Sequence, residues 1–326
     1  MSDESDFEEF VRLTDRFEKP SRVGRSVFPT SAEEPIESKD RIVSPGQPTQ
    51  YALFDDGYKP TTSTVRFLPS GSYVVNVSQH GPYVSPMPEP SGLLLELPEM
   101  RSDDIIKLVQ NFWDSEKDYK EGNEFVIGGA IFKQGLLIYG PPGSGKSCTL
   151  KILSKKLIER EGLVFYSSVH PMHLGNFLSD FSKIETQRKI IVILEDIDSQ
   201  IEQFGESNFL EVLDSAKTID NVLFVATTNY PERLDPRIYN RPGRFANVVK
   251  VGYPTIKARE AYLKAILKNH KDIPYIVEHS DGFTVDHLSS LVNSVYREKK
   301  ELKSEIERLR TLFKVPKANE SLKIGF

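Results

Sequence analysis

The stretch Gly135-Leu136-Leu137-Ile138-Tyr139-Gly140-Pro141-Pro142-Gly143-Ser144-Gly145-Lys146-Ser147-Cys148 decides the fold of this chain. Residues 140–147 match the pattern G-x-x-x-x-G-K-[ST], in which a glycine-rich turn wraps around phosphate groups. An apolar run precedes the turn, and residues 150, 153, 157 and 158 follow it as apolar positions on one helix face. The pattern therefore predicts a strand, a turn and the N-terminus of a helix.

The chemistry expected of this loop is phosphate binding. Glycines let successive backbone N–H groups converge on phosphate oxygens at the positive end of the helix dipole. Lys146 is expected to reach the outer phosphates, and the Ser147 hydroxyl to ligate Mg²⁺. The alternative, a plain turn between a strand and a helix, does not require all the matched positions. Cys148, the single cysteine, is explained more simply as a small side chain at the helix start than as a redox group. The residues expected to contact nucleotide are Gly140, Pro141, Pro142, Gly143, Ser144, Gly145, Lys146, Ser147 and Cys148.

The composition fits a soluble, intracellular enzyme. At 326 residues and 38% hydrophobic content the chain has enough apolar side chains for a sizeable core. No apolar run approaches the roughly 18 residues that span a bilayer, so we expect a cytoplasmic location and no membrane segment. Residues 1–40 hold 11 acidic and 6 basic side chains, which equals the net charge of −5 for the whole chain. The balanced remainder does not indicate nucleic-acid binding.

Composition and patterning divide the chain into four expected segments. The first is acidic and rich in Ser, Pro and Glu, and we expect it to be disordered apart from a short amphipathic piece at residues 7–17. The second is β-prone, with a hairpin expected from residues 64–68 and 72–77 and a further strand at 93–97. The expected segments are an acidic tail at 1–50, a small β-rich module at 51–100, an α/β core at 101–254 and a helical lid at 255–326.

Alternating strands and helices indicate an α/β core with a parallel sheet sandwiched by helices. Strands are expected at residues 136–139, 163–167, 190–194, 222–226 and 247–251. The first four are near-continuous apolar runs, as a sheet buried on both faces requires, and the last is an edge candidate. One helix is expected from Ser102. The lid is expected to contain a helix at 256–268 and a long one from Thr284 to about residue 314, which packs one face rather than forming a coiled coil.

Two adjacent acids, Glu195 and Asp196, follow the apolar strand at 190–194. A P-loop enzyme holds Mg²⁺ and activates water at this position. Two solvated acids at a strand end are the alternative, which the phosphate loop upstream disfavours.

Four motifs together resemble those of the AAA ATPases. They are residues 140–147, Leu194-Glu195-Asp196-Ile197-Asp198, Ala226-Thr227-Thr228-Asn229, and Leu234-Asp235-Pro236 leading to Asn240-Arg241-Pro242-Gly243-Arg244-Phe245. In order and spacing they resemble Walker A, Walker B, sensor 1 and the second region of homology, and the resemblance covers residues 128–300. It implies a P-loop NTPase core with a helical lid, and ATP and Mg²⁺ as cofactors.

The resemblance also implies a role for each matched residue. Glu195 would help to hold Mg²⁺ together with Ser147, and Asp196, also near the metal, would orient or deprotonate the attacking water. Asn229 would sense the terminal phosphate, and Lys146 would bind it. Arg241 and Arg244 would act as arginine fingers on the ATP of a neighbouring subunit, since a guanidinium stabilises charge on the transferred phosphoryl group. A homo-oligomeric ring follows, expected to be hexameric and to act on a protein substrate.

Some positions depart from the family pattern. The usual order of the two acids is Asp then Glu, so the expected base is one methylene shorter here, as in some branches of the family. Val285 and Asp286 stand where a Gly-Ala pair is usual before the lid helix, which puts contact with adenosine in doubt. Residues 168–176 would form the pore loop, in which Met172 and Leu174 are candidates to grip an extended polypeptide.

The leading interpretation is a ring-forming ATPase that remodels, unfolds or disassembles proteins. No His-Glu-x-x-His protease motif occurs in the sequence. A DNA-linked AAA+ motor or loader is the first alternative, although the basic residues of the last helix are interleaved with glutamates. A slow, nucleotide-gated assembly protein is the second.

Overall fold

The computed structural model describes residues 50–54, 57–61, 64–88, 94–125, 128–215, 219–241 and 244–312. The expected acidic tail at residues 1–49 lies outside the described residues. The chain divides into two compact units with a boundary between Thr64 and Val65. In the first unit, β1 (Gln50–Phe54) and β2 (Gly57–Thr61) form an antiparallel pair with Gln50 opposite Thr61.

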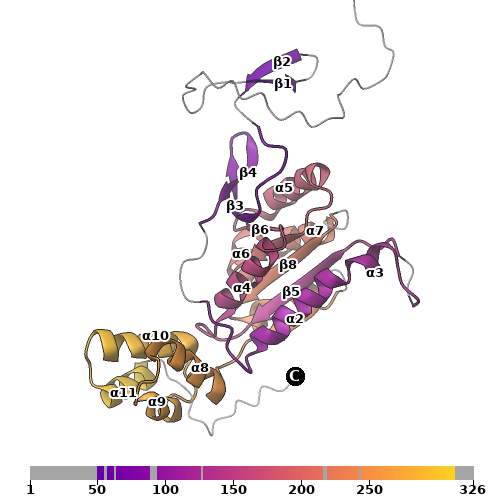
Figure 1. The fold of residues 1–326 in the computed structure, drawn as a ribbon. Coiled ribbons are helices and arrows are strands. Elements are labelled where there is room, and N and C mark those ends of the chain that lie inside the picture. Colours follow the sequence, from indigo (N-terminus) through magenta and orange to yellow (C-terminus); the bar gives the residue numbers. More distant parts are fainter. Residues whose placement is uncertain are drawn as a thin grey trace, which may run out of the picture. The chain divides into compact units, whose positions relative to one another are not determined.

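A seven-stranded sheet organises the second unit (Figure 1). Its strands run in the spatial order β4, β3, β6, β7, β8, β5, β9, and all neighbours are parallel except β3 and β4. Their bounds are β3 (Gly71–Ser78), β4 (Gly81–Pro86), β5 (Lys133–Tyr139), β6 (Leu163–Tyr166), β7 (Ile190–Leu194), β8 (Val222–Thr228) and β9 (Asn247–Lys250). The five strands expected from the apolar runs are confirmed, and β9 lies at an edge.

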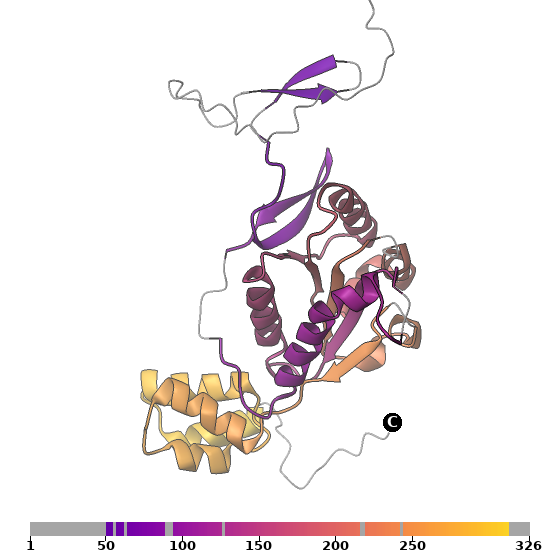
Figure 2. The same cartoon turned by 45° about the vertical axis from the view of Figure 1, so that its right-hand side comes forward.

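Helices cover both faces of this sheet, because alternate side chains of its apolar strands point to opposite sides. In β7, Ile191 and Ile193 join the core under α2 and α4, whereas Val192 and Leu194 join the core under α5, α6 and α7. Figure 2 shows α2 lying across one face. The helices around the sheet are α2 (Arg101–Asp114), α3 (Glu116–Lys120), α4 (Lys146–Ile158), α5 (Pro171–Ile184), α6 (Ile197–Phe204) and α7 (Glu206–Ser215).

The hairpin expected within residues 51–100 is formed by a different pair of strands. Residues 64–68 form no strand, and β3 pairs with β4 instead. Residues 94–97, in the described part of the expected third strand, are also irregular. β3 adds in parallel to β6, with Tyr73 opposite Phe165, so the hairpin extends the main sheet. The pairing of β3 with β6 joins residues about 90 positions apart, so no local pattern in the sequence predicts it. The turn at residues 79–80 between β3 and β4, by contrast, is a local feature.

The lid consists of short helices grouped together at one end of the second unit (Figures 1 and 2). Its elements are α8 (Ile256–Leu267), α9 (Ile273–His279), α10 (Val285–Val292), the π-helical turn η4 (Asn293–Arg297) and α11 (Leu302–Leu312). Thr284 caps α10 by accepting the His287 N–H, and the His287 ring accepts the Thr284 N–H in return. No described helix is long and apolar enough to cross a membrane.

The prediction of a single long helix from Thr284 onward is wrong. The chain breaks after η4, where Lys299 has a left-handed φ of 60°. Glu301 then starts a new helix, because its carboxylate accepts the N–H groups of Lys303 and Ser304. The apolar positions keep the same spacing on both sides of the break, and Lys299, the residue with the left-handed φ, is the one position at which the apolar pattern is interrupted.

Candidate nucleotide-binding site

Three of the expected site segments follow strands that are neighbours in the sheet. The glycine loop follows β5, Glu195 and Asp196 follow β7, and Asn229 follows β8, which lies between β5 and β7. Parallel strands place their carboxyl ends at one edge of the sheet, where ligands of open α/β folds bind. The strand order therefore brings together residues that are up to 89 positions apart in the sequence.

Lys146 makes hydrogen bonds to several residues of this cluster. Its ammonium donates to the Asn229 side-chain oxygen at 2.6 Å, and to the carbonyls of Gly140 at 2.8 Å and Pro141 at 3.0 Å. The Asn229 amide donates in turn to Asp196 at 3.4 Å. Burial lowers the pKa of Lys146, and the nearby carboxylates of Asp196, Asp286 and Asp198 partly offset this effect. The oxygens that accept hydrogen bonds from the Lys146 ammonium are neutral carbonyl and amide oxygens, and phosphate oxygens can take their place.

Asp196 has a backbone conformation that few residues adopt. Its φ of 49° and ψ of 52° are left-handed, and the residue stands at the N-cap of α6. Its N–H donates to the hydroxyl of Thr227 at 3.2 Å, which ties the acid to the end of β8. Left-handed conformations at non-glycine residues cluster at functional sites, where the surrounding structure holds them.

Hydrogen bonds behind the site fix the other strand ends. The Gln200 amide donates to the carbonyl of Glu195 at 2.7 Å. The Thr228 hydroxyl donates to Asp198 at 2.6 Å and accepts the N–H of Tyr230 at 2.9 Å, and these two contacts flank Asn229. These bonds of Thr228, which stands in the Ala226–Asn229 motif, and of Gln200 are not predictable from the motifs, because the acceptors Asp198 and Glu195 belong to other parts of the fold.

The cluster opens into a cavity of about 510 Å³. Both acids are exposed there, as is the Ser147 side chain. Two carboxylates, a hydroxyl and an ammonium fit a magnesium nucleotide, because Mg²⁺ prefers oxygen ligands and usually keeps substrate phosphates in its coordination sphere. The wall also includes Thr227 of the Ala226–Asn229 motif and four residues that none of the motifs contains: Leu94, Lys151, Tyr262 and Ser289. Lys151 lies one helical turn after Ser147, and this spacing is the signal that would have found it.

An apolar cavity of about 80 Å³ adjoins the first and shares Gly145, Cys148, Tyr262 and Val285 with it. Its other walls come from residues 95–102 and from α4. Aliphatic and aromatic walls of this kind suit a planar base. Burial raises the pKa of the Cys148 thiol, so the side chain is a neutral part of the wall near neutral pH.

The two arginines of the second region of homology differ in exposure. Arg244 has only 6% of its side chain exposed, and its guanidinium donates to both oxygens of Asp214 at 3.1 and 2.7 Å. Arg241 is 56% exposed and contacts the same Asp214 at 3.2 Å. Among the described residues that line the phosphate cavity of this chain, neither arginine occurs. Asp214, at the end of α7, thus pairs with both arginines of the loop that carries Arg241 and Arg244, which we call the arginine loop.

The expected pore loop is only partly exposed. Met172 is 55% exposed at the start of α5, and the His170 ring accepts its N–H. Leu174, however, is 1% exposed and packs in the core beneath the sheet, so the expectation that it grips a polypeptide is wrong. α5 begins at Pro171, and one turn later its inner face is already buried.

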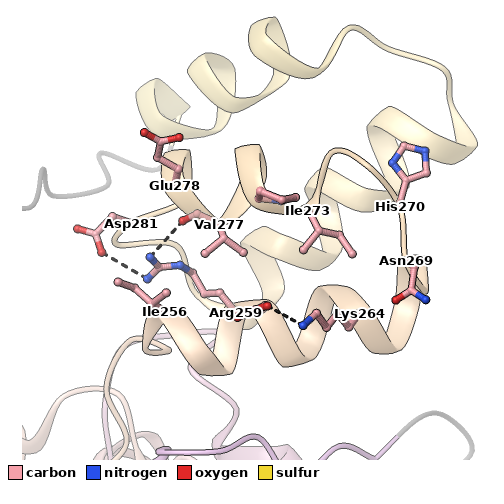
Figure 3. Close-up of a pocket in the computed structure, with 11 residues that line it drawn as sticks. Ile256, Arg259, Lys264, Asn269, His270, Ile273, Val277, Glu278 and Asp281 are labelled. Carbon is pink, nitrogen blue, oxygen red and sulfur yellow. Dashed lines mark hydrogen bonds and ion pairs between the residues drawn. The ribbon is translucent and has the colours of Figure 1, made fainter.

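A larger cavity, of about 860 Å³, lies within the lid between α8 and α9 (Figure 3). Arg259 crosses its wall and donates to the carbonyls of Pro254 and Val277 and to Asp281. All of its lining residues belong to the lid, and none of them comes from the glycine loop.

Comparison with known proteins agrees with this geometry. Residues 136–253 match the model of the family described as ATPase family associated with various cellular activities (AAA). This chain carries an AAA ATPase domain. The matched residues run from β5 to just past β9 and so contain all four motifs.

The chain is similar to several known proteins over a stretch longer than the AAA domain. The ATP-dependent zinc metalloprotease FtsH of Veillonella parvula is 29% identical over 63% of this chain and 35% of its own length. Protein CdcH of Halobacterium salinarum is 27% identical over 62% of this chain and 31% of its length. The ATPase family gene 2 protein of Schizosaccharomyces pombe is 29% identical over 46% of this chain and 20% of its length. The chain thus spans about a third of the first two relatives.

Proposed function

We propose that this chain hydrolyses ATP at sites shared between the subunits of a homo-oligomeric ring, and that it uses the cycle to remodel, unfold or disassemble a protein substrate. The observation that carries the proposal is the hydrogen-bonded series from Lys146 through Asn229 to Asp196 at one edge of the sheet. The similarity to FtsH and CdcH supports it at the level of the family.

Each residue of the cluster has a proposed task. Bound magnesium would neutralise phosphate charge, with Ser147 and Glu195 as its protein ligands. Lys146 would exchange its carbonyl ligands for phosphate oxygens. Asp196 would orient the attacking water and accept its proton, and Asn229, bonded to both Lys146 and Asp196, would fix the distance between the phosphate and the water.

The arginine loop supports a shared site. Arg241 is exposed on a loop that does not line the described cavity of its own chain, which supports the proposal that it contacts a phosphate bound to another subunit. Arg244 would have to leave its buried ion pair with Asp214 to act in the same way. We therefore propose Arg241 as the principal finger and Arg244 as the residue that needs a rearrangement.

A mixing experiment tests the shared site. Lys146→Ala removes nucleotide binding but leaves the finger, whereas Arg241→Ala removes the finger but leaves the cavity. We expect each variant alone to be inactive and an equimolar mixture to recover ATP turnover, because a mixed interface pairs an intact cavity with an intact finger. A mixture as inactive as its components, in oligomers shown by mass measurement to be mixed, would contradict the shared site.

The Asp196→Asn variant tests hydrolysis and the substrate. It should bind ATP without turning it over, and so hold the oligomer and its bound protein in the ATP state. Turnover at the wild-type rate would exclude Asp196 as the base. Proteins captured by Asp196→Asn and not by Lys146→Ala are the candidate substrates.

A further inference from the structure

The lid reaches the phosphate loop through Asp286. The Asp286 N–H donates to the carbonyl of Gly143 at 3.4 Å. A Cβ atom placed on Gly143 would lie 2.9 Å from both the Cβ and a carboxylate oxygen of Asp286. Real Cβ atoms do not approach other atoms so closely, so glycine at position 143 is what lets this side chain of α10 lie against the loop.

Asp286 adds a third carboxylate to the phosphate cavity. Glu195 and Asp196 enter it from the core, and Asp286 enters from the lid. The ammonium groups on the cavity wall are those of Lys146 and Lys151. The Asp286 charge reaches Lys146, where it opposes the lowering of the pKa that burial causes. The proposed function assigns magnesium ligation to Glu195 and orientation of the water to Asp196, and it leaves the lid acid without a task.

A capping role does not explain the position of Asp286 either. An acid in the first turn of a helix is favourable because of the helix dipole, but this effect holds for any direction of the side chain. The cap of α10 is already complete, since Thr284 and His287 exchange hydrogen bonds. The carboxylate nevertheless lies against the glycine loop, where phosphate oxygens are expected.

We propose that Asp286 is a specificity residue that selects the magnesium complex of the nucleotide over the metal-free form. The inference rests on the proposed function, in which the cavity beside Lys146 holds the triphosphate. A fixed negative charge repels a ligand in proportion to the ligand's charge, and bound Mg²⁺ removes two of the negative charges of ATP. The lid carboxylate therefore penalises metal-free ATP more than its magnesium complex.

Nucleotide affinity, measured in the full chain, tests this inference. A fluorescent ATP analogue is titrated into wild type, Asp286→Asn and Glu278→Gln, once with excess Mg²⁺ and once with a chelator. Glu278→Gln is the matched control, because it removes one exposed carboxylate from the same lid at a position on α9 that lines the other cavity (Figure 3). Equal melting temperatures confirm that the variants are folded.

We expect Asp286→Asn to tighten binding of metal-free nucleotide roughly tenfold and binding of the magnesium complex by less than about threefold. Glu278→Gln should change both affinities by less than about twofold, because its charge is exposed and screened. Unchanged affinities in Asp286→Asn would overturn the inference. Weaker binding in both conditions would also overturn it, since the carboxylate would then accept a hydrogen bond from the nucleotide.

Lys146→Ala separates this inference from the proposed function. If that variant binds nucleotide as tightly as wild type, the cavity is not the nucleotide site and the proposed function itself fails. If it loses binding while Asp286→Asn behaves as wild type, only the selectivity of Asp286 is refuted.

Discussion

The ion pairs of Asp214 allow a sharp test of how the arginine loop is held. Asp214→Ala would leave the Arg244 guanidinium buried, with 6% of its side chain exposed and no carboxylate at the position that now accepts two of its hydrogen bonds. Removal of one partner of a buried ion pair costs about 3–5 kcal/mol. Asp214 is itself 30% exposed, so water can reach the vacated position and we expect a loss near the lower limit, about 3 kcal/mol. The Arg244 guanidinium keeps its bond to the Arg237 carbonyl, which limits the loss further.

Arg241→Ala is the matched comparison. It removes the other arginine that pairs with Asp214, but one that is 56% exposed, so the expected loss is about 0.2–1 kcal/mol. Urea unfolding followed by circular dichroism measures the free energy of unfolding of each variant. Equal losses for the two variants, or a loss below about 1 kcal/mol for Asp214→Ala, would refute the view that a buried Arg244 anchors this loop.

Three further predictions concern the loop, the lid and the thiol. Gly135→Ala should lower the melting temperature by several degrees, because a Cβ there would lie 2.2 Å from the Arg244 carbonyl oxygen, and neither backbone can yield easily; an unchanged melting temperature would contradict this. Burial lowers the pKa of His287, so the unfolded chain binds more protons than the folded one near the unfolded pKa of about 6.5. The stability of the fold should therefore fall as the pH drops through this value. His287→Gln keeps a cap acceptor for the Thr284 N–H and should show a flatter pH profile in thermal melts. Cys148 should be alkylated by iodoacetamide slowly at neutral pH and faster only above the usual thiol range of about 8.5, since burial raises its pKa, and bound nucleotide should protect it; mass spectrometry measures both effects.

The sheet and the phosphate loop are predictable because their signals are local. The run at 190–194 is apolar at every position, and the structure buries it on both faces. The glycine pattern, likewise, needs only eight consecutive residues. The positions of Asn229 and Asp196 next to Lys146 follow from the order of motifs in a known family, not from spacing.

The rest of the site depends on contacts between distant segments. Tyr262 and Asp286 reach the cavity only because the lid folds back onto the loop, and no periodicity reports this. The burial of Leu174 was not predicted for a similar reason. The sequence places Leu174 in a loop, but α5 begins at Pro171 and turns its side chain inward. The break of the last helix depends on one carboxylate, that of Glu301, which bonds to two N–H groups.

The outer strand β4 has a consequence for how copies of this chain can meet. Pro82 and Pro86 stand near its two ends, opposite Val77 and Tyr73, and neither has an N–H to offer to another strand. The opposite edge, β9, is only four residues long. A second chain therefore finds little backbone at either edge on which to extend the sheet, so strand addition is disfavoured. Contacts between copies at the seven-stranded sheet are therefore expected to use side chains and loops, which can separate and re-form more easily than a continuous sheet.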